Sequence, residues 1–437
     1  MVAVTTAFVR IWGKVVGAVA WDEEMGVANF EYDPRFKGED IDLAPIQIPI
    51  SSNQQVFRFP ELRELKNADF NTFKGLPGVL ADVLPDNYGN QLINLYLAQL
   101  GRAENSMNPV EQLCFIGTRG MGALEFEPTK LKVSKNTFEV EIKSLVGIAQ
   151  RILNNRESFE TNVNKDEQKA VLDILKIGTS AGGARPKAII AYNKKTGQVR
   201  SGQTNAPAGF EHWMIKLDGV SEAQFGSTQG YGRVEMAYYL MAVDCGIHMM
   251  ESQLIEENGR AHFLTKRFDR EEGNVKHHVQ TFCAMRHFDF NQVQSFSYEQ
   301  LFETMRMLRL PYPDAEQMYR RMVFNILARN CDDHTKNTAF RLKEGGRWEL
   351  APAYDICHAY RPGSLWVSQH ALSVNGKRID IQLEDLMTFA QAMNIKKAKQ
   401  IIKEVKTVVG KWEDYANEAS VDTKLRDEIW NTFPSVI

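Results

Sequence analysis

The chain has 437 residues and a formal net charge of −3, with the apolar and charged content of an ordinary globular protein. This length exceeds what one simple core needs, so we expect two or three structural units. The near-neutral charge gives no overall attraction to nucleic acid or to an anionic membrane. No apolar run approaches the roughly 18 residues of a membrane span, and the N-terminus lacks the basic and apolar segments of a signal peptide.

The five cysteines are scattered along the chain and form no CxxC pair. Their odd number and their spacing suggest neither a disulfide framework nor a zinc site. A reducing compartment fits this pattern, and we therefore expect a cytoplasmic protein without a membrane partner.

The first part of the chain predicts a β-rich unit. Residues 5–31 alternate apolar and polar side chains, which is typical of an antiparallel meander. The segment Gly75–Gly101 contains two prolines and then an amphipathic helix that ends at Gly101. Met121–Pro128 predicts a closing strand, so we place the end of this unit near residue 130.

The middle of the chain predicts a sheet with helices. A helical pattern over residues 138–176 gives way to strands at Lys187–Tyr192 and His212–Leu217. A helix is expected over Gly232–Cys245. The dipeptide Asn258-Gly259 between two strands is the strongest short hairpin signal in the chain.

The last part of the chain is helical in pattern. Helices are expected at Tyr298–Arg309, Pro313–Arg329, Leu383–Met393, Ile395–Trp412 and Thr423–Trp430. The predicted organisation is thus an α+β chain of three parts, which are residues 1–130, residues 131–272 and residues 273–437.

Two clusters of basic residues have ordinary explanations. The helix at 395–412 carries Lys396, Lys399, Lys403 and Lys406 on one face. We expect this face to be solvated, and contact with a DNA backbone is the alternative. The pair His277-His278 is expected at the surface.

The stretch Asn330–Tyr360 carries the strongest chemical signal. Asp332 and Asn337 follow a buried helix, and a short hairpin then leads to Asp355. An acid that positions an acceptor hydroxyl, an amide ligand for Mg²⁺ and an acidic Mg²⁺ ligand beyond a hairpin are the arrangement of protein-kinase sites. Magnesium prefers few carboxylates together with phosphate oxygens and water. The alternatives are a solvated turn at Asp332 and a turn cap at Asp355.

Lys216 lies among apolar residues in the predicted strand HWMIKL, where an unpaired buried ammonium group is costly. We interpret it as a lysine that binds ATP phosphates, with Glu235 in the next helix as a weak candidate partner. The alternative is a lysine that faces outward from an alternating strand.

The strand end HFLTKRFDR is the position at which a two-lobed kinase binds adenine through backbone groups. In that interpretation Lys266 and Phe268 flank the adenine site, and Asp269 contacts the ribose. The alternative is a plain strand end.

The segment Gly178–Lys187, GTSAGGARPK, is rich in small residues whose backbone N–H groups can approach a phosphate. It also contains the G-x-S-x-G pattern of serine hydrolases, but a helix precedes it and a strand follows, which inverts the context that a nucleophile elbow requires. A structural connection is a third possibility. The residues predicted to contact the nucleotide here are Ser180, Ala181, Gly182, Gly183 and Lys187.

Together these motifs resemble the HipA family of kinase toxins from type II toxin–antitoxin systems, in family order and over nearly the whole chain. The matching motifs are GLPGVLADVLPDNYG (75–89), GALEF (122–126), SAGGARPK (180–187), IKLDG (215–219), KRFDR (266–270), DDHTKN (332–337) and LAPAYDI (350–356).

The resemblance implies a protein-kinase-like two-lobed fold with an N-terminal β-rich subdomain and a helical C-terminal lobe. It implies that Asp332 is the catalytic aspartate and that Asn337 and Asp355 hold Mg²⁺. Lys216 matches the lysine that binds ATP phosphates, and His334 of the DDHTKN motif is expected at the nucleotide.

The resemblance also assigns the hinge to Lys266 and Phe268, and it makes Ser180 the serine that such kinases autophosphorylate. Family members phosphorylate aminoacyl-tRNA synthetases, the glutamyl enzyme above all, and thereby promote persistence. A helix-turn-helix antitoxin of the HipB type binds the toxin and operator DNA. The alternatives are a catalytically silent HipA-like corepressor and, more remotely, a serine hydrolase that uses Ser180.

Overall fold

The structure of the protein is a computed structural model that describes residues 4–63, 71–85, 87–131, 139–154, 186–202, 205–220 and 230–435. The chain divides into two compact units. Unit 1 comprises residues 1–43, 48–232 and 253–278, and unit 2 comprises residues 44–47, 233–252 and 279–437. Unit 1 thus joins the N-terminal region with the sheet that follows it, while the three-part division stays a prediction.

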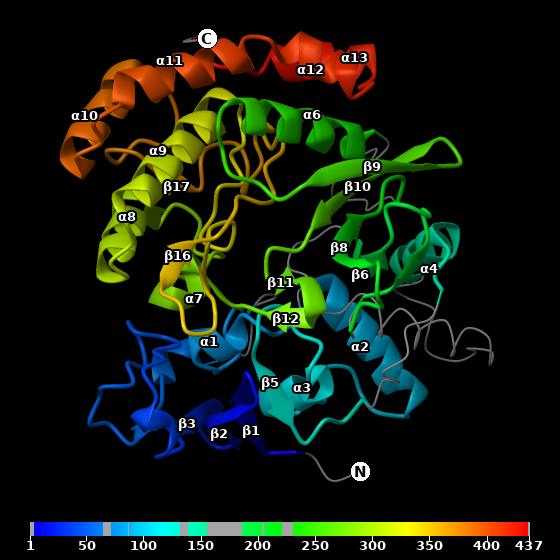
Figure 1. The fold of residues 1–437 in the computed structure, drawn as a ribbon, viewed down its shortest axis with the longest axis vertical. Coiled ribbons are helices and arrows are strands. Elements are labelled where there is room, and N and C mark those ends of the chain that lie inside the picture. The colour runs from blue at the N-terminus through cyan, green and yellow to red at the C-terminus, as the bar shows by residue number, and fades with distance from the viewer. Residues whose placement is uncertain are drawn as a thin grey trace. The chain divides into compact units, whose positions relative to one another are not determined.

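The N-terminal sheet of unit 1 is the predicted meander with its closing strand (Figure 1). Successive strands pair antiparallel, and β5 joins the free edge of β1. In sheet order the strands are β4 (Val56–Phe57), β3 (Val27–Tyr32), β2 (Lys14–Asp22), β1 (Thr6–Ile11) and β5 (Glu125–Glu127). Alternate residues such as Val9 and Phe30 are buried, which is the pattern that the sequence showed.

The second sheet of unit 1 contains the strands predicted for the middle of the chain. Its order is β7 (Val199–Ser201), β6 (Lys187–Tyr192), β8 (Glu211–Lys216), β10 (Arg260–Lys266) and β9 (Ser252–Glu257). Asn258 and Gly259 both have positive φ, at 48° and 76°, as the tight hairpin between β9 and β10 requires. β8 is therefore the central strand, with Lys216 at its C-terminal end.

The described residues of unit 1 also form helices and short segments. The helices are α1 (Gly78–Ala81), α2 (Asn87–Gln99), α3 (Pro109–Ile116) and α4 (Ile142–Asn154), with short 3-10 helices at Phe36–Gly38, Pro60–Leu62 and Glu272–Asn274. The small hairpin of β11 (Arg270–Glu271) and β12 (Val275–Lys276) follows β10. α2 is the amphipathic helix that the sequence predicted to end at Gly101.

Unit 2 is mainly helical. Its helices are α6 (Tyr231–Asp244, from Arg233 on), α7 (Phe282–Arg286), α8 (Tyr298–Met307), α9 (Tyr312–Leu327), α10 (Leu383–Met393), α11 (Ala398–Val409), α12 (Trp412–Glu418) and α13 (Thr423–Trp430). Met322, Val323 and Phe324 of α9 are fully buried, so this helix runs through the hydrophobic core.

Two small sheets accompany these helices. One has the order β13 (His278–Thr281), β15 (Ala339–Leu342) and β16 (Trp348–Leu350), and the other pairs β14 (Phe296–Ser297) with β17 (Leu372–Ser373) in parallel. β15 and β16 form the predicted hairpin, with Phe340 opposite Leu350.

The prediction that His277 and His278 lie at the surface is wrong. Both side chains are buried, and Nε2 of His278 lies 3.0 Å from the carbonyl oxygen of Leu43. Burial lowers the pKa of His278 to about 4, so its imidazole is neutral. Two adjacent histidines carry no local sign of burial in the sequence.

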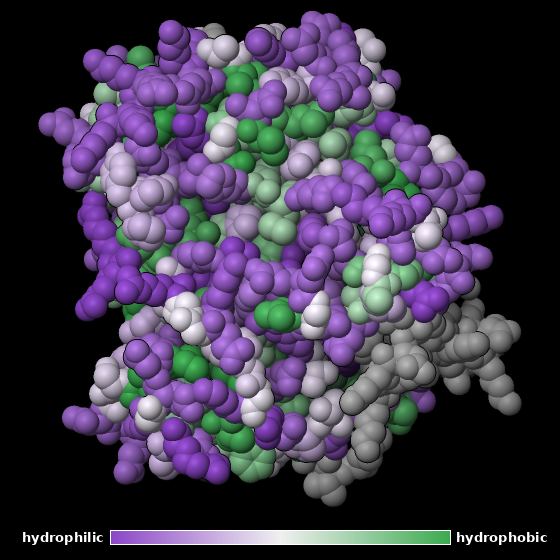
Figure 2. All heavy atoms as spheres, in the orientation of Figure 1, coloured by the Kyte–Doolittle hydropathy of each residue, from purple (hydrophilic) through white to green (hydrophobic). Residues whose placement is uncertain are grey.

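As expected, the side chains are solvent-exposed at Lys399, Lys403 and Lys406 of α11 and at Lys396, which precedes the helix. In the view of Figure 2, hydrophobic residues form small patches between larger hydrophilic areas. Among the described residues, no helix combines the length and the apolar character that crossing a bilayer requires.

Candidate active site

The loop that begins at Asp332 is anchored where it leaves the core. α9 ends at Leu327, and Arg329 has a φ of 51°, in the left-handed region. The amide of Cys331 donates to the carbonyl of Ala359 over 3.0 Å, and the amide of Ala359 donates to the carbonyl of Arg329 over 3.1 Å. The first residues of the loop are thus fixed by main-chain bonds to a distant segment.

Within this loop, Asp332, His334 and Asn337 contact one another. The side-chain Nδ2 of Asn337 donates to the backbone carbonyl of Asp332 over 2.6 Å. This bond uses the amide nitrogen and leaves Oδ1 of Asn337 to act as a ligand. Nε2 of His334 lies 3.6 Å from Oδ1 of Asp332, whose side chain is 43% exposed. A carboxylate, an amide oxygen and an imidazole are therefore presented from one short segment.

The hairpin of β15 and β16 brings Asp355 to the same place. Asn337 and Asp355 line one cavity of unit 2, together with Asn330 and Arg321. Asp355 has a φ of 56°, a conformation that is uncommon for residues other than glycine and that is concentrated at functional sites. The sequence predicted this convergence from the hairpin, and the structure has Asn337 and Asp355 on one cavity.

Asp333, for which the sequence analysis predicted no role, anchors the loop to buried polar groups. Its carboxylate is buried and accepts a hydrogen bond from Tyr298 Oη at 2.7 Å and another from the amide of Ala371 at 2.7 Å. Nδ1 of His370 lies 3.0 Å from the same carboxylate. Burial alone would lower the pKa of His370, but the adjacent carboxylate raises it to about 10, so the imidazolium is charged.

The network continues through two buried asparagines. Asn325 of α9 donates from Nδ2 to Tyr298 Oη over 3.1 Å, and Asn330 donates from Nδ2 to Oδ1 of Asn325 over 3.0 Å. A helix, a loop and the segment after β16 thus share one set of polar contacts. The sequence showed polar residues directly after a buried helix, and these were assigned to a loop without contacts to the helix.

Arg321 is a further buried cation of this region. Its guanidinium donates to the carbonyl of Ala351, immediately after β16, over 2.8 Å. Burial lowers the pKa of Arg321 to about 10, which still leaves it charged at neutral pH. The side chain ties α9 to the chain that leads to Asp355.

In unit 1, Lys216 lies opposite a second lysine. The antiparallel pairing of β6 with β8 sets Lys187 directly across from Lys216, and Phe263 of β10 is opposite Lys216 on the other side. Nζ of Lys216 is 5.9 Å from the centre of the Phe263 ring. Like charges that face each other across a strand pair are unfavourable. The structure thus places Lys187 and Lys216 side by side on neighbouring strands, and their contact with ATP phosphates stays a prediction.

The predicted hinge begins at the end of β10. Lys266 and Phe268 are partly exposed, and Lys266 forms an ion pair with Glu211. The amide of Arg267 donates to the carbonyl of His212 over 2.9 Å. These contacts fix the backbone of the strand end, and the adenine contact of Lys266 and Phe268 stays a prediction.

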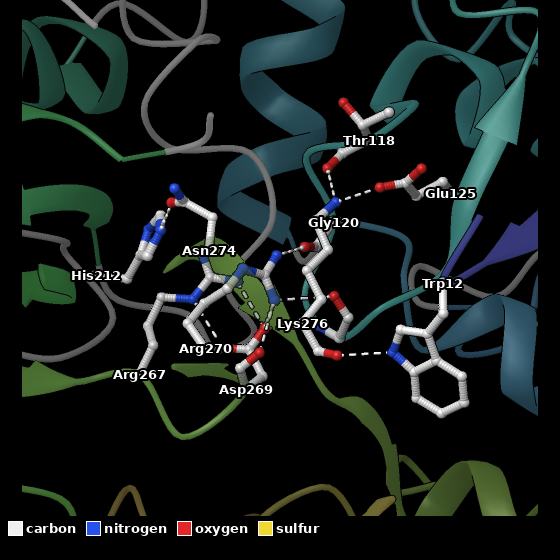
Figure 3. Close-up of polar contacts among 11 residues, drawn as sticks. Trp12, Thr118, Gly120, Glu125, His212, Arg267, Asp269, Arg270, Asn274 and Lys276 are labelled. Carbon is white, nitrogen blue, oxygen red and sulfur yellow. Dashed lines mark hydrogen bonds and ion pairs between the residues drawn. The ribbon is translucent and has the colours of Figure 1, made fainter. Parts of the chain in front are cut away.

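Asp269, by contrast, is fully buried between arginines (Figure 3). Arg267 donates to both of its carboxylate oxygens, at 2.8 and 2.7 Å, and Arg270 donates over 2.6 Å. The amide of Gly122 adds a bond of 2.8 Å. Burial opposes ionisation of Asp269, but Arg267 and Arg270 keep its pKa well below the usual range. The predicted ribose contact would require these bonds to break.

This cluster holds two parts of unit 1 together. Arg270 also donates to the carbonyls of Gly122 and Gly120, at 2.9 and 3.0 Å. Nζ of Lys276 reaches the carbonyl of Thr118 at 2.8 Å and Glu125 at 2.6 Å (Figure 3). The motifs GALEF and KRFDR, which are far apart in the sequence, are thus linked by hydrogen bonds.

Two further predictions concern the small-residue loop and Glu235. Ser180, Ala181, Gly182 and Gly183 lie outside the described residues. Glu235 is buried in α6 and belongs to unit 2, whereas Lys216 belongs to unit 1. Their pairing stays a prediction.

Comparison with known proteins gives two family models that match the chain. The model described as the HipA N-terminal domain matches residues 7–127, and the model described as the HipA-like C-terminal domain matches residues 179–412. No curated protein is similar to the chain in sequence.

Solved structures are also similar. HipA of a Shewanella oneidensis MR-1 toxin–antitoxin system, solved with HipB and its operator DNA, matches with a TM-score of 0.65 and 16% identity, over 97% of this chain and 94% of that chain. The proinflammatory kinase CtkA of Helicobacter pylori matches with a TM-score of 0.35 and 14% identity, over 57% of this chain and 92% of that chain. The similarity to the Shewanella structure confirms the predicted α+β fold class.

Proposed function

The chain belongs to the HipA family, and we propose that it is an ATP- and Mg²⁺-dependent serine/threonine protein kinase, the toxin of a toxin–antitoxin pair. One observation carries the proposal. Asn337 and Asp355 line the same cavity, and the amide of Asn337 is bonded to the backbone of Asp332. An acid and two oxygen ligands in this arrangement suit phosphoryl transfer.

The donor set fits magnesium. In the part of the chain that the structure describes, no cluster of three or more His, Cys, Asp or Glu residues could hold a metal by itself. Mg²⁺ in kinases is usually held by one or two protein oxygens and completed by phosphate oxygens and water. Asn337 and Asp355 supply such a pair, and the opposed lysines Lys187 and Lys216 supply positive charge for phosphates.

Bound Mg·ATP supplies the transferable phosphoryl group and part of the charge neutralisation. The residues of the chain do the positioning. Asp332, which is partly exposed, orients the acceptor hydroxyl and accepts its proton. Asn337 and Asp355 would hold the metal, and His334 beside Asp332 would lie at the nucleotide. The contribution of the protein is then mostly orientation and electrostatics.

The test compares purified full-length wild type with Asp332→Asn and Asp355→Asn, using γ-labelled ATP. The acceptors are the protein itself and purified aminoacyl-tRNA synthetases, with the glutamyl enzyme first. Loss of the acid or of a metal ligand should lower the transfer rate on the order of 10³-fold. Glu303→Gln, which changes an exposed carboxylate of α8 in the same unit, is the matched control and should retain wild-type transfer.

Equal labelling by wild type and both aspartate variants would disprove the kinase assignment. ATP and Mg²⁺ binding without transfer to any acceptor would instead favour the silent corepressor. Intact-mass spectra of the active protein should also show a phosphate that Ser180→Ala and Asp332→Asn both remove. A phosphate that survives in Ser180→Ala would assign autophosphorylation to another residue.

The partners proposed for this chain follow from its family. A HipB-like helix-turn-helix antitoxin would bind the chain, and the complex would bind operator DNA. Co-purification with the product of an adjacent helix-turn-helix reading frame, followed by a gel-shift assay on the upstream DNA, tests this. A stable complex that shifts no DNA would remove the operator from the proposal.

A further inference from the structure

An aromatic and cationic surface lies beside the candidate catalytic loop, within unit 2. The ring of Phe290 is 5.2 Å from the ring of His334, and the ring of Trp366 is 6.4 Å from Phe290. Nζ of Lys336 is 4.7 Å from the centre of the Phe290 ring. Since His334 contacts Asp332 at 3.6 Å, a continuous series of contacts leads from the candidate catalytic acid to this surface.

The surface exposes large apolar side chains. Leu365 is 67% exposed and Trp366 is 38% exposed, next to the partly exposed Phe290. The turn that carries Leu365 and Trp366 is ordered by its own bonds, because the amides of Trp366 and Val367 both donate to Oγ of Ser364 at 3.3 Å. Exposed aromatic side chains held in place are typical of surfaces that bind other chains.

Lys336 adds a positive charge without a carboxylate to match it. Among the described residues, no Asp or Glu forms an ion pair with its ammonium group, which lies instead over the Phe290 ring. Its backbone is fixed on both sides, since its amide donates to Nδ1 of His334 over 3.2 Å and its carbonyl accepts from Tyr354 Oη over 2.6 Å. A cation held in this way is complementary to an acidic group on a partner.

We propose that Lys336, Phe290 and Trp366 form the subsite that binds the acceptor segment of a protein substrate. The inference rests on the proposed kinase function. An acceptor hydroxyl must reach Asp332, so the rest of the acceptor segment passes over the surface next to it. An extended chain advances about 3.3 Å per residue. The successive contacts from Asp332 through His334 and Phe290 to Trp366 would therefore be spanned by roughly five residues of the acceptor segment.

The chemistry of the subsite defines the acceptor. Lys336 selects a Glu or Asp close to the phosphorylated Ser or Thr. Phe290 and Trp366 select a large apolar or aromatic side chain farther along the segment. The acceptor class is therefore an extended, acidic segment with an aromatic anchor.

The experiment uses the purified full-length protein and a positional library of serine peptides, in which each flanking position carries Glu, Gln, Lys or Phe. Peptide binding is measured by fluorescence anisotropy without ATP, and phosphotransfer is measured separately. Wild type should prefer Glu over Lys at one position and Phe over Gln at another. Lys336→Glu should reverse the first preference, and Lys336→Ala should weaken binding of the Glu peptide about fivefold.

Trp366→Ala should remove the preference for Phe, with binding about tenfold weaker. It should raise the KM for peptide and leave the KM for ATP unchanged. Lys399→Ala on α11 and Trp430→Ala on α13, which change an exposed lysine and an exposed tryptophan of the same unit, are the matched controls. Both should bind all peptides as wild type does.

The outcomes separate the two proposals. Selective peptide binding without phosphotransfer would contradict the kinase assignment and support the subsite. Phosphotransfer with no flanking preference, or with preferences that Lys336→Glu and Trp366→Ala leave unchanged, would overturn the subsite alone. A dimer in solution that Trp366→Ala dissociates would also overturn it, because the surface would then bind a second copy of the chain.

Discussion

Two segments of the molecule, 266–270 in unit 1 and 330–337 in unit 2, are rich in charged residues but use their carboxylates differently. In the first, Asp269 is fully buried and each oxygen is bound by an arginine. In the second, Asp333 is buried in a similar way, while Asp332 beside it remains partly exposed. Adjacent aspartates thus allow one loop to be anchored by one carboxylate and to leave the other partly exposed.

We expect the largest effect on stability from a substitution of the buried Asp269. In Asp269→Asn, Arg267 and Arg270 stay buried but lose the carboxylate with which both are paired, and an arginine cannot shed its proton to escape. We expect the free energy of unfolding to fall by about 3–5 kcal/mol. Denaturant titration measures this, and Glu127→Gln, which weakens the exposed pair with Arg10, should change it by less than about 1 kcal/mol. A small effect at Asp269 would mean that the cluster contributes little to holding unit 1 together.

Asp333→Asn should have the next largest effect. The variant loses the charge that faces His370 and one of three accepted hydrogen bonds, but the imidazole can become neutral, which limits the penalty. We expect a loss of about 2–3 kcal/mol in unfolding free energy. The rate of phosphotransfer should fall as well, because the loop that carries Asp332 loses its internal anchor. Full stability with full activity would show that Asp333 does not organise this loop.

The pH dependence of the unfolding free energy tests the pair of Asp333 and His370 separately. The pKa of His370 is raised to about 10 in the folded chain by Asp333, against about 6.5 for an ordinary histidine. Its contribution is therefore fully present below about pH 6.5 and is lost as the pH rises toward 10. The difference in unfolding free energy between wild type and His370→Gln should shrink over this interval. A difference that stays constant with pH would show that His370 is not charged.

Asp332→Asn should have the smallest effect on stability. Its side chain is partly exposed, so the unfolding free energy should change by no more than about 0.5 kcal/mol. The same variant should have lost phosphotransfer. Destabilisation comparable to that of Asp333→Asn would remove the distinction between the two neighbours.

The sequence predicted the fold well where patterns are local. The meander, the Asn258-Gly259 hairpin and α10 (Leu383–Met393) follow from alternation, turn chemistry and helical periodicity, which neighbouring residues determine. That Asn337 and Asp355 lie close together could also be predicted, because a short hairpin brings the residues at its two ends near each other.

Long-range polar contacts were not predictable in the same way. His370 meets Asp333 across 37 residues, and Gly122 meets Asp269 across 147 residues. Neither pairing leaves a local pattern, since a buried carboxylate and an exposed one look alike in sequence. For the same reason His277 and His278 were misplaced, and Asp333 was assigned no role.

The hairpin of β15 and β16 has a practical consequence for engineering. Both candidate metal ligands flank it, and the pairing of Phe340 with Leu350 sets the separation of its two ends. Its tip, at Glu344–Gly346, is exposed and takes no part in that pairing. A tag or a fluorescent reporter inserted at the tip should therefore be tolerated, whereas a single residue added within either strand would shift the register and displace one ligand from the other.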